Sequence, residues 1–553
     1  ELHVTDSSTI DKNQTVKGDQ TVSGTTTTKE LHVTDSSTID KNLTVKGDSS
    51  TTGNQTVGGN STVNGNSETK GNSTTDGSST VKGDQTVGGT TNTTNLNVSG
   101  DTNLHNTTIT GDSHVTNNQT VDGSSTVKGD SNVGGNENVS GTTTTKELHV
   151  TDSSTIDKNL TVKGDSETKG NSTTDGSSTV KGDQSVAGTT TTKELHVTDS
   201  ATVDKNLTVS GNTETKGNNT VDGNQTVSGD SSTTGNQTVG GNETVKGDQN
   251  VSGNTTIGKD LTVDGSETVK GDSNTTGNSN VGGNSTVTGN SETKGNETVD
   301  GNQETGGNSH VKGNQTVDGT STIGGNETVK GNQTTEGNSY TKGTVTVDGT
   351  SRFHDNVTVD GKIRATDNIT SNSNIIADGN VVANTDLIAH GDIKADGNQT
   401  IDGNSHIGGN LDVKGDATVA GDSETKGNNT VDGNQTVKGD ATVNGSTQID
   451  KDLSVKGNES VDGSSTIGGD SHVQGSQTVD KDQTVGGNTQ VKGNQTVDGS
   501  STIGGDAEVK GNTQLDKDLS VKGNESVAGS STIGGDSHVQ GSQTVDKDQT
   551  VSG

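Results

Sequence analysis

The side chains best suited to acid–base or metal chemistry in this sequence are its twelve histidines. Nine of them directly precede an aliphatic residue: His3, His32, His114, His149, His196, His310, His406, His472 and His538. Because side chains alternate faces along a strand, this position places the imidazole on the side opposite the apolar residue. No H-x-H or H-E-x-x-H spacing occurs. We therefore expect these histidines on an outer surface, without a bound metal.

The acidic and glycine-rich motifs do not match the pattern of a metal-binding, phosphate-binding or catalytic site either. Asp480-Lys481-Asp482, Asp516-Lys517-Asp518 and Asp546-Lys547-Asp548 pair carboxylates of the kind that Ca²⁺ prefers, but a lysine separates each pair and no calcium loop surrounds it. The abundant glycines form no phosphate-binding loop. The sequence shows no nucleophile elbow and indicates no paired buried carboxylates. We predict a chain that is not an enzyme, with no catalytic residue, metal or cofactor.

N-x-[S/T] sequons recur along the chain, for example at Asn54, Asn60 and Asn494. They could carry glycans in a secreted eukaryotic or archaeal protein. The simpler interpretation is that the repeat generates them, because asparagine suits a corner and threonine suits a strand.

The elements that carry these residues follow a strict repeat. From Val443 to Val551, nineteen aliphatic residues stand six residues apart, and the same spacing runs back, with interruptions, to Val4. The residues predicted to line the core are Val443, Ile449, Val455, Val461, Ile467, Val473, Val479, Val485, Val491, Val497 and Ile503. A fixed short period of this kind is typical of stacked repeat architectures.

Each hexad, usually V-x-G-[N/D]-x-T, predicts one short strand and one sharp corner. A strand of about three residues centred on the valine would point it inward and its two neighbours outward, so that threonines stack from layer to layer. Glycine would supply a positive φ at the corner, and Asn or Asp would tolerate the left-handed conformation there.

Composition narrows the class of protein. Only 19% of the 553 residues are apolar, the net charge is −35, and Pro and Cys are absent. Such values are usual for disordered chains, but the sustained spacing and the abundance of Thr and Val favour ordered β-structure. The acidic balance argues against a nucleic-acid partner, and no stretch is apolar enough to cross a membrane.

The oligomeric state follows from two arguments. One buried valine per hexad recovers less free energy than ordering six residues costs. Sharing the apolar line among several chains would therefore add to the stability of the fold. A block beginning at Ile449 recurs at Leu515, eleven hexads later, which is not a multiple of three. We therefore predict a fibrous, all-β hexapeptide-repeat β-helix, formed as an intertwined homotrimer. The alternative is a single-chain three-sided β-solenoid.

Two features interrupt the regular shaft. Four eleven-residue steps, such as Val22 to Val33, combine a hexad with a pentad and should tighten a corner or change the twist. Residues 340–397 hold both aromatics and both arginines, namely Tyr340, Arg352, Phe353 and Arg364. There the apolar phase slips between Val359 and Ile363, while Ile376, Val382 and Ile388 add a second line. We predict a shaft at 1–339, a denser node or collar at 340–397, and a regular shaft at 398–553.

The phrases NLTVSGN, GTTTTKELHV and SNIIADGNVVANTDLIAHGDIKADGN resemble the low-complexity repeats of tailed-phage fibres and related virion appendages. The resemblance implies a homotrimeric, extracellular, non-enzymatic shaft, collar or whisker that spaces a host-attachment tip and contacts other virion proteins at its ends. No tip domain is visible in the sequence. A bacterial adhesin stalk or extracellular filament at the cell surface is the alternative. A third is a Thr-rich ice-binding solenoid, which would need flat T-x-T arrays.

Overall fold

The structure is a computed structural model that describes all residues from 1 to 553. Every regular element is a β-strand. Most strands have three residues and are followed by a three-residue corner, as in β75 (Gln477–Val479), β76 (Gln483–Val485) and β77 (Thr489–Val491). The predicted all-β hexapeptide repeat is therefore confirmed.

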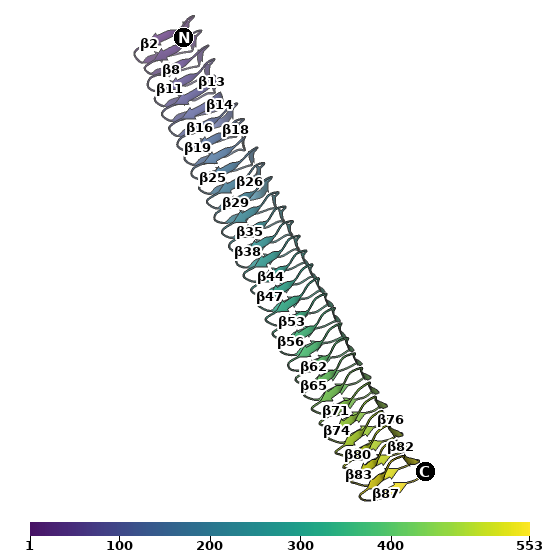
Figure 1. Ribbon diagram of the computed structural model, residues 1–553. Helices are drawn as coiled ribbons and strands as arrows, with labels where there is room; N and C mark the ends of the chain where they lie inside the picture. Colours follow the sequence, from purple (N-terminus) through teal and green to yellow (C-terminus); the bar gives the residue numbers. More distant parts are fainter. The chain divides into compact units, whose positions relative to one another are not determined.

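Most strands pair in parallel with the third strand after them. Thus β75 pairs with β78 (Gln495–Val497), and Val479 lies opposite Val497, eighteen residues away. Three successive strands make one three-sided coil, and the stacked coils form a parallel β-solenoid. Figure 1 shows this stacking along one face, where β29 (Ala201–Val203), β35 (Gln237–Val239) and β38 (Thr255–Ile257) follow one another.

The chain divides into two units, residues 1–276 and 277–553. The first holds β1 (Leu2–Val4) to β41 (Ser273–Thr275), and the second holds β42 (Ser279–Val281) to β87 (Gln549–Val551). Each unit is a stack of about fifteen coils, each closed by this one chain. The fold of the chain is thus the three-sided solenoid given above as the alternative, and the intertwined homotrimer stays a prediction.

Each strand points two residues inward, not one. In β75 the side chains of Gln477 and Val479 are buried and Thr478 lies between them on the outside. The expectation of a strand centred on the valine is wrong, because the strand ends on the valine and the residue two positions earlier also faces the core. That first inward position is commonly Gln, Ser, Thr or Glu, so a polar layer accompanies the aliphatic one.

The aliphatic residues chosen from the sequence all lie in this core. Their exposed fractions are 5% or less: Val443, Ile449, Val455, Val461, Ile467, Val473, Val479, Val485, Val491, Val497 and Ile503. Each stacks on the aliphatic residue eighteen positions away, as Val443 does on Val461.

The corners are built differently from the prediction. No residue, glycine included, has a positive φ, so neither glycine nor Asn is there for a left-handed backbone. At Gly505 an added Cβ would lie 2.9 Å from the carbonyl carbon of Gly487 and would overlap the Oδ1 of Asn488. That Oδ1 accepts the N–H of Asp506 at 2.8 Å. Glycine is required because stacked corners approach closely, and Asn or Asp because its oxygen joins one corner to the next.

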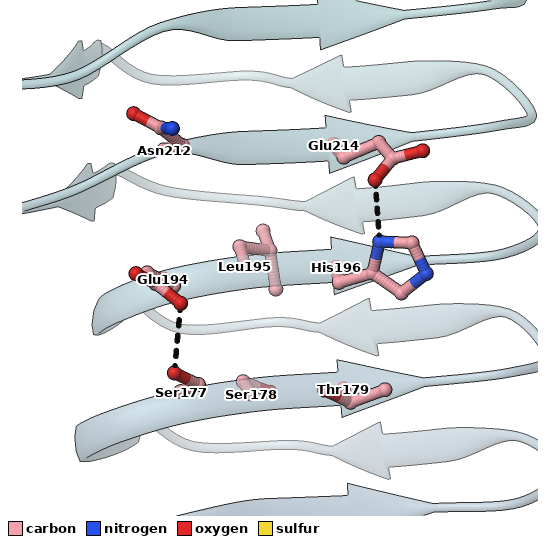
Figure 2. A pocket seen from close by; sticks show the side chains of 8 residues that line it. All are labelled: Ser177, Ser178, Thr179, Glu194, Leu195, His196, Asn212 and Glu214. Carbon is pink, nitrogen blue, oxygen red and sulfur yellow. Dashed lines mark hydrogen bonds and ion pairs between the residues drawn. The ribbon is translucent and has the colours of Figure 1, made fainter.

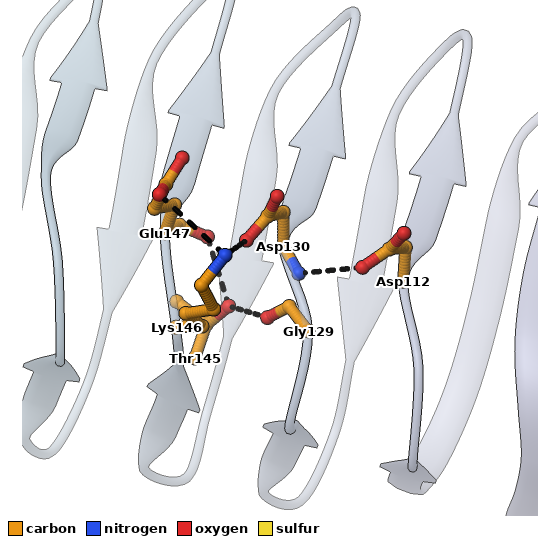
Figure 3. Close-up of polar contacts among 6 residues, drawn as sticks. All are labelled: Asp112, Gly129, Asp130, Thr145, Lys146 and Glu147. Atoms are coloured by element: carbon orange, nitrogen blue, oxygen red, sulfur yellow. Dashed lines mark hydrogen bonds and ion pairs between the residues drawn. The ribbon is translucent and has the colours of Figure 1, made fainter.

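The predicted pentads do tighten their corners. Between β21 (Thr143–Thr145) and β22 (Leu148–Val150) only Lys146 and Glu147 remain. The hydroxyl of Thr145 donates to the carbonyl oxygens of Gly129, at 3.1 Å, and Glu147, at 2.9 Å (Figure 3). Thr28, Thr93 and Thr192 make the same pair of bonds at the other three predicted pentads. An inward threonine in place of valine therefore accompanies the shortened corner.

Five strands run through a corner beside these pentads. They are β13 (Ser73–Val81), β14 (Gln85–Val98), β15 (Thr102–Ile109), β26 (Ser172–Val180) and β28 (Thr190–Val197). Where a hexad corner stacks on a pentad corner, the register shifts as in a β-bulge, for example between Thr75 and Ser78 of β13.

The repeated sequence block occupies different faces at its two occurrences. Ile449 ends β70 (Thr447–Ile449) and Leu515 ends β81 (Thr513–Leu515). Since strands three apart share a face, strands eleven apart do not. Hexads are interchangeable among the three faces of one chain, so the 66-residue offset does not require three chains.

Candidate functional surfaces

The middle residue of each strand points outward and forms much of the outer surface of the solenoid. The nine histidines that precede an aliphatic residue all occupy this position, and none of them is buried. Their predicted outward orientation is confirmed. At four places a histidine lies 2.8–3.3 Å from a glutamate of the adjacent coil: His149 with Glu167, His196 with Glu214, His354 with Glu336, and His406 with Glu424.

These His–Glu pairs are surface contacts. In the pair of His196 and Glu214 the side chains are 37% and 52% exposed, and solvated polar contacts of this kind contribute little to stability. No group of three or more His, Cys, Asp or Glu side chains is placed to hold a metal ion.

A shallow hollow lies beside the pentad corner of β28 (Figure 2). Its lining includes Ser177, Glu194, His196 and Glu214. The Ser177 hydroxyl donates to Glu194 at 3.0 Å, and the His196 ring meets Glu214 at 2.9 Å. The serine and histidine are thus engaged with separate carboxylates in different coils and do not form a nucleophile–base pair.

Another polar contact surrounds the pentad corner at Lys146 (Figure 3). Its ammonium lies 3.2 Å from Asp130 and 3.7 Å from Glu147. The hydrogen bond to Asp130 and the neighbouring negative charges raise the pKa of Lys146 above its usual value. Asp130 in turn donates its backbone N–H to Asp112, so the cluster ties three successive coils together.

The Asp-Lys-Asp motifs lie at corners. The Asp482 carboxylate accepts the N–H of Ser500 at 2.9 Å, and Asp518 accepts that of Asp536 at 2.8 Å. The sequons have a similar basis: Asn54 accepts the N–H of Asn72 at 2.8 Å, while Thr56 is the middle residue of β10 (Gln55–Val57). The carboxylates and amides of these motifs therefore have a structural use in the corner ladder.

Outward threonines form rows along the faces. In the first unit one row runs without interruption through seven coils: Thr155, Thr173, Thr191, Thr208, Thr226, Thr244 and Thr262. Each strand contributes one outward residue to its face, so the row is single file and not a T-x-T array.

The segment 340–397 keeps the regular hexad. β55 (Val357–Val359) and β56 (Ile363–Ala365) start six residues apart, so the slip in the apolar phase between Val359 and Ile363 does not change the strand spacing. The large apolar residue moves from the third residue of the strand to the first, and alanine or serine takes the third. Both inward positions become mostly apolar here.

The four residues predicted to mark that segment do not lie together. Phe353 is in the core, 1% exposed. Tyr340 is the middle residue of β52 (Ser339–Thr341), and its hydroxyl donates to Asp360 at 3.0 Å. Arg352 and Arg364 also occupy middle, outward positions, in β54 (Ser351–Phe353) and β56. Ile376, Val382 and Ile388 are the outward residues of three successive strands, one on each face of a single coil.

Sequence reasoning missed the buried carboxylates. Glu137, Glu243, Glu297, Glu327 and Glu459 occupy the first inward position and are at most 4% exposed. Burial is the main cause that raises the pKa of each, to about 8 for Glu243 and about 7 for Glu137, Glu327 and Glu459.

Glutamine side chains solvate two of these carboxylates, Glu297 and Glu327. The charge of Glu297 raises the pKa of Glu327. Gln303 and Gln315 donate to Glu297 at 3.0 and 3.1 Å, and Gln333 donates to Glu327 at 2.7 Å. The spacing of the repeat could have revealed these inward glutamates, because each stands two residues before an aliphatic residue.

Comparison with known proteins gives no relative. No protein-family model, curated protein or solved structure matches the chain. No helix that could span a membrane is present.

Proposed function

We propose that this chain is a structural shaft, a stiff spacer without catalytic activity. The observation that carries the proposal is that each unit consists entirely of one repeated coil, joined to the next by backbone ladders on three faces. Many identical weak layers resist bending and unravelling collectively. In the hollow beside β28, Ser177 and His196 contact separate carboxylates.

The surface supports the same role. Closed coils leave no free lateral strand edge along their sides, and the net charge of −35 opposes side-by-side association. At about 4.8 Å per coil, the fifteen or so coils of each unit extend over about 70 Å.

The resemblance of the repeats to phage-fibre sequences places the shaft, in this proposal, in a virion appendage outside the cell. There it would space a host-attachment tip and contact other appendage proteins at its ends. An adhesin stalk at a bacterial surface is the alternative location. The intertwined homotrimer is also part of the proposal.

Particle dimensions and mass test this proposal. Negative-stain microscopy of the purified chain, with light scattering, should reveal stiff rods. About 440 Å with triple mass would favour an intertwined trimer with one hexad per layer, and about 150 Å with single mass would favour a single-chain solenoid. Globular or flexible particles would contradict the shaft.

Ice binding is a second candidate, favoured by the seven-coil threonine row. Coil spacing repeats the hydroxyl and methyl groups every ~4.8 Å along a face, although the row is only one residue wide. Thermal hysteresis of the purified chain tests this directly. Replacement of both Thr208 and Thr226 by lysine should abolish any hysteresis. No hysteresis in the unaltered chain removes this candidate.

A further inference from the structure

One coil of the first unit carries three long polar side chains in its core. Gln237, Glu243 and Gln249 are the first inward residues of β35, β36 (Glu243–Val245) and β37 (Gln249–Val251). Their exposed fractions are 1%, 0% and 0%. Since three successive strands close one coil, the three side chains enter the interior at the same level.

The hydrogen bonds of this layer are unevenly distributed. The amide groups of Gln225 and Gln237 both donate to Oε1 of Glu243, the first at 3.0 Å. Oε2 of Glu243 has no partner, and neither do the amide oxygen of Gln237 and both amide atoms of Gln249. The layer therefore has three unpaired acceptor atoms against one unpaired donor nitrogen, an arrangement that is costly in a buried site.

No cationic side chain compensates the carboxylate. The strands packed against β36 are β33 (Gln225–Val227), β39 (Leu261–Val263), β35 and β37, and their inward residues are Gln, Leu and Val. The one charged group that acts on Glu243 is Glu267 of β40 (Glu267–Val269), which is also acidic. An ionised Glu243 would thus be a buried negative charge without a counter-charge.

We propose that Glu243 is held in the folded solenoid as a neutral carboxylic acid, whose proton is donated from Oε2 to an amide oxygen of the same coil. The proton supplies a further donor to a layer in which unpaired acceptor atoms outnumber unpaired donors. When it dissociates, the layer contains an uncompensated charge, and the coils around it open more readily. The first unit thereby carries a pH-sensitive point in its core.

The direction of the pH effect follows from the protonation states. Burial raises the pKa of Glu243 from 4.5 to about 8; Gln249 and Gln237 oppose this shift, and Glu267 adds to it. Between these values the folded state holds a proton that the opened state releases. Stability is therefore full below about pH 4.5 and is lost as the pH rises to about 8, with local opening growing up to tenfold per pH unit.

Hydrogen exchange of the full chain between pH 5 and 9, corrected for intrinsic exchange rates, tests the proposal. In the unaltered protein, opening of residues 219–267 should increase with pH and level off near pH 8. In E243Q, which keeps the shape and supplies an N–H donor, the increase with pH should be much smaller, with Glu267 the remaining buried carboxylate of the segment. E68Q, at an outward position, is the matched control and should behave as the unaltered chain. Parallel profiles for E243Q and the unaltered chain would overturn the proposal.

Infrared spectroscopy gives an independent measurement if E243Q destabilises the unit. The carbonyl absorption of protonated carboxylic acids should persist at pH 7 in the unaltered protein and decrease in E243Q, but not in E68Q. An unaltered band in E243Q at pH 7 would mean that Glu243 is ionised and would equally overturn the proposal.

Discussion

The coils between Val345 and Ala395 and the coils around Glu243 have the same backbone but opposite interiors. In the former, β58 (Ile375–Ala377) buries two apolar residues and stacks between Val357 and Ile393. In the latter, β36 buries a carboxylic side chain among amides. The first inward position therefore determines the chemistry of the core without determining the fold.

The corners explain why the same coil forms around either a polar or an apolar interior. In the apolar coils Asn374 accepts the N–H of Asp392 at 2.8 Å, and in the polar coils Asn224 accepts that of Asn242 at 2.9 Å. The same corner ladder and the same eighteen-residue pairing recur in both places. The backbone thus fixes the coil, and the core needs only side chains of suitable size.

Charge placed in the apolar coils should produce the largest effect. I375E buries a carboxylate without amide donors, and we expect it to destabilise its coils by about 3–5 kcal/mol at neutral pH. The neighbouring outward substitution I376E is the matched control and should cost less than about 1 kcal/mol. Local hydrogen exchange measures both. Equal effects of the two substitutions would contradict the assigned inward and outward positions.

Corner substitutions should have smaller effects that are similar in the two regions. In G391A the new Cβ would lie 2.8 Å from the carbonyl carbon of Ser373, and in G241A 2.8 Å from that of Gly223. We expect each to destabilise its coils by about 1–3 kcal/mol, as overpacking does. Hydrogen exchange at the two corners should change alike. A large effect in only one region would show that the core chemistry does influence the corner.

Removal of a corner oxygen should have the smallest effect. N374A deletes the acceptor for Asp392 and should cost about 1 kcal/mol, the usual contribution of one hydrogen bond. N374D keeps the oxygen and should be nearly neutral, because Asp470 accepts the N–H of Asn488 in the same way. Destabilisation by N374D equal to that of N374A would exclude the ladder as the reason for Asn at corners.

The sequence predicted the β-solenoid class, the aliphatic line and the tight pentads because these depend on spacing alone. It did not predict the second inward position. Gln477 and Glu243 are polar residues that would normally lie at a surface, and only the strand boundary, which ends on the valine, places them inside. With twice the expected number of inward side chains per coil, the argument for sharing one valine line among chains also becomes weaker.

The reasons given for two other features were also incomplete. Gly505 was expected for its conformational freedom, yet its requirement comes from the neighbouring coil, which a single repeat does not reveal. Between Val359 and Ile363 the apolar spacing changed while the strand spacing did not. An apolar pattern alone cannot distinguish a moved strand from a large residue moved between two inward positions.

Because each of the three faces accepts any hexad, the gene can gain or lose hexads while the protein keeps its fold. Any duplication or loss of whole hexads leaves the core continuous, so length can change in steps of six residues without a folding defect. Each step, however, rotates every downstream surface residue by one face. The block that recurs from Ile449 to Leu515 advances by eleven such steps and displays the same outward residues on another side. Recombination could therefore reposition a surface epitope around the axis while leaving the coil that carries it unchanged.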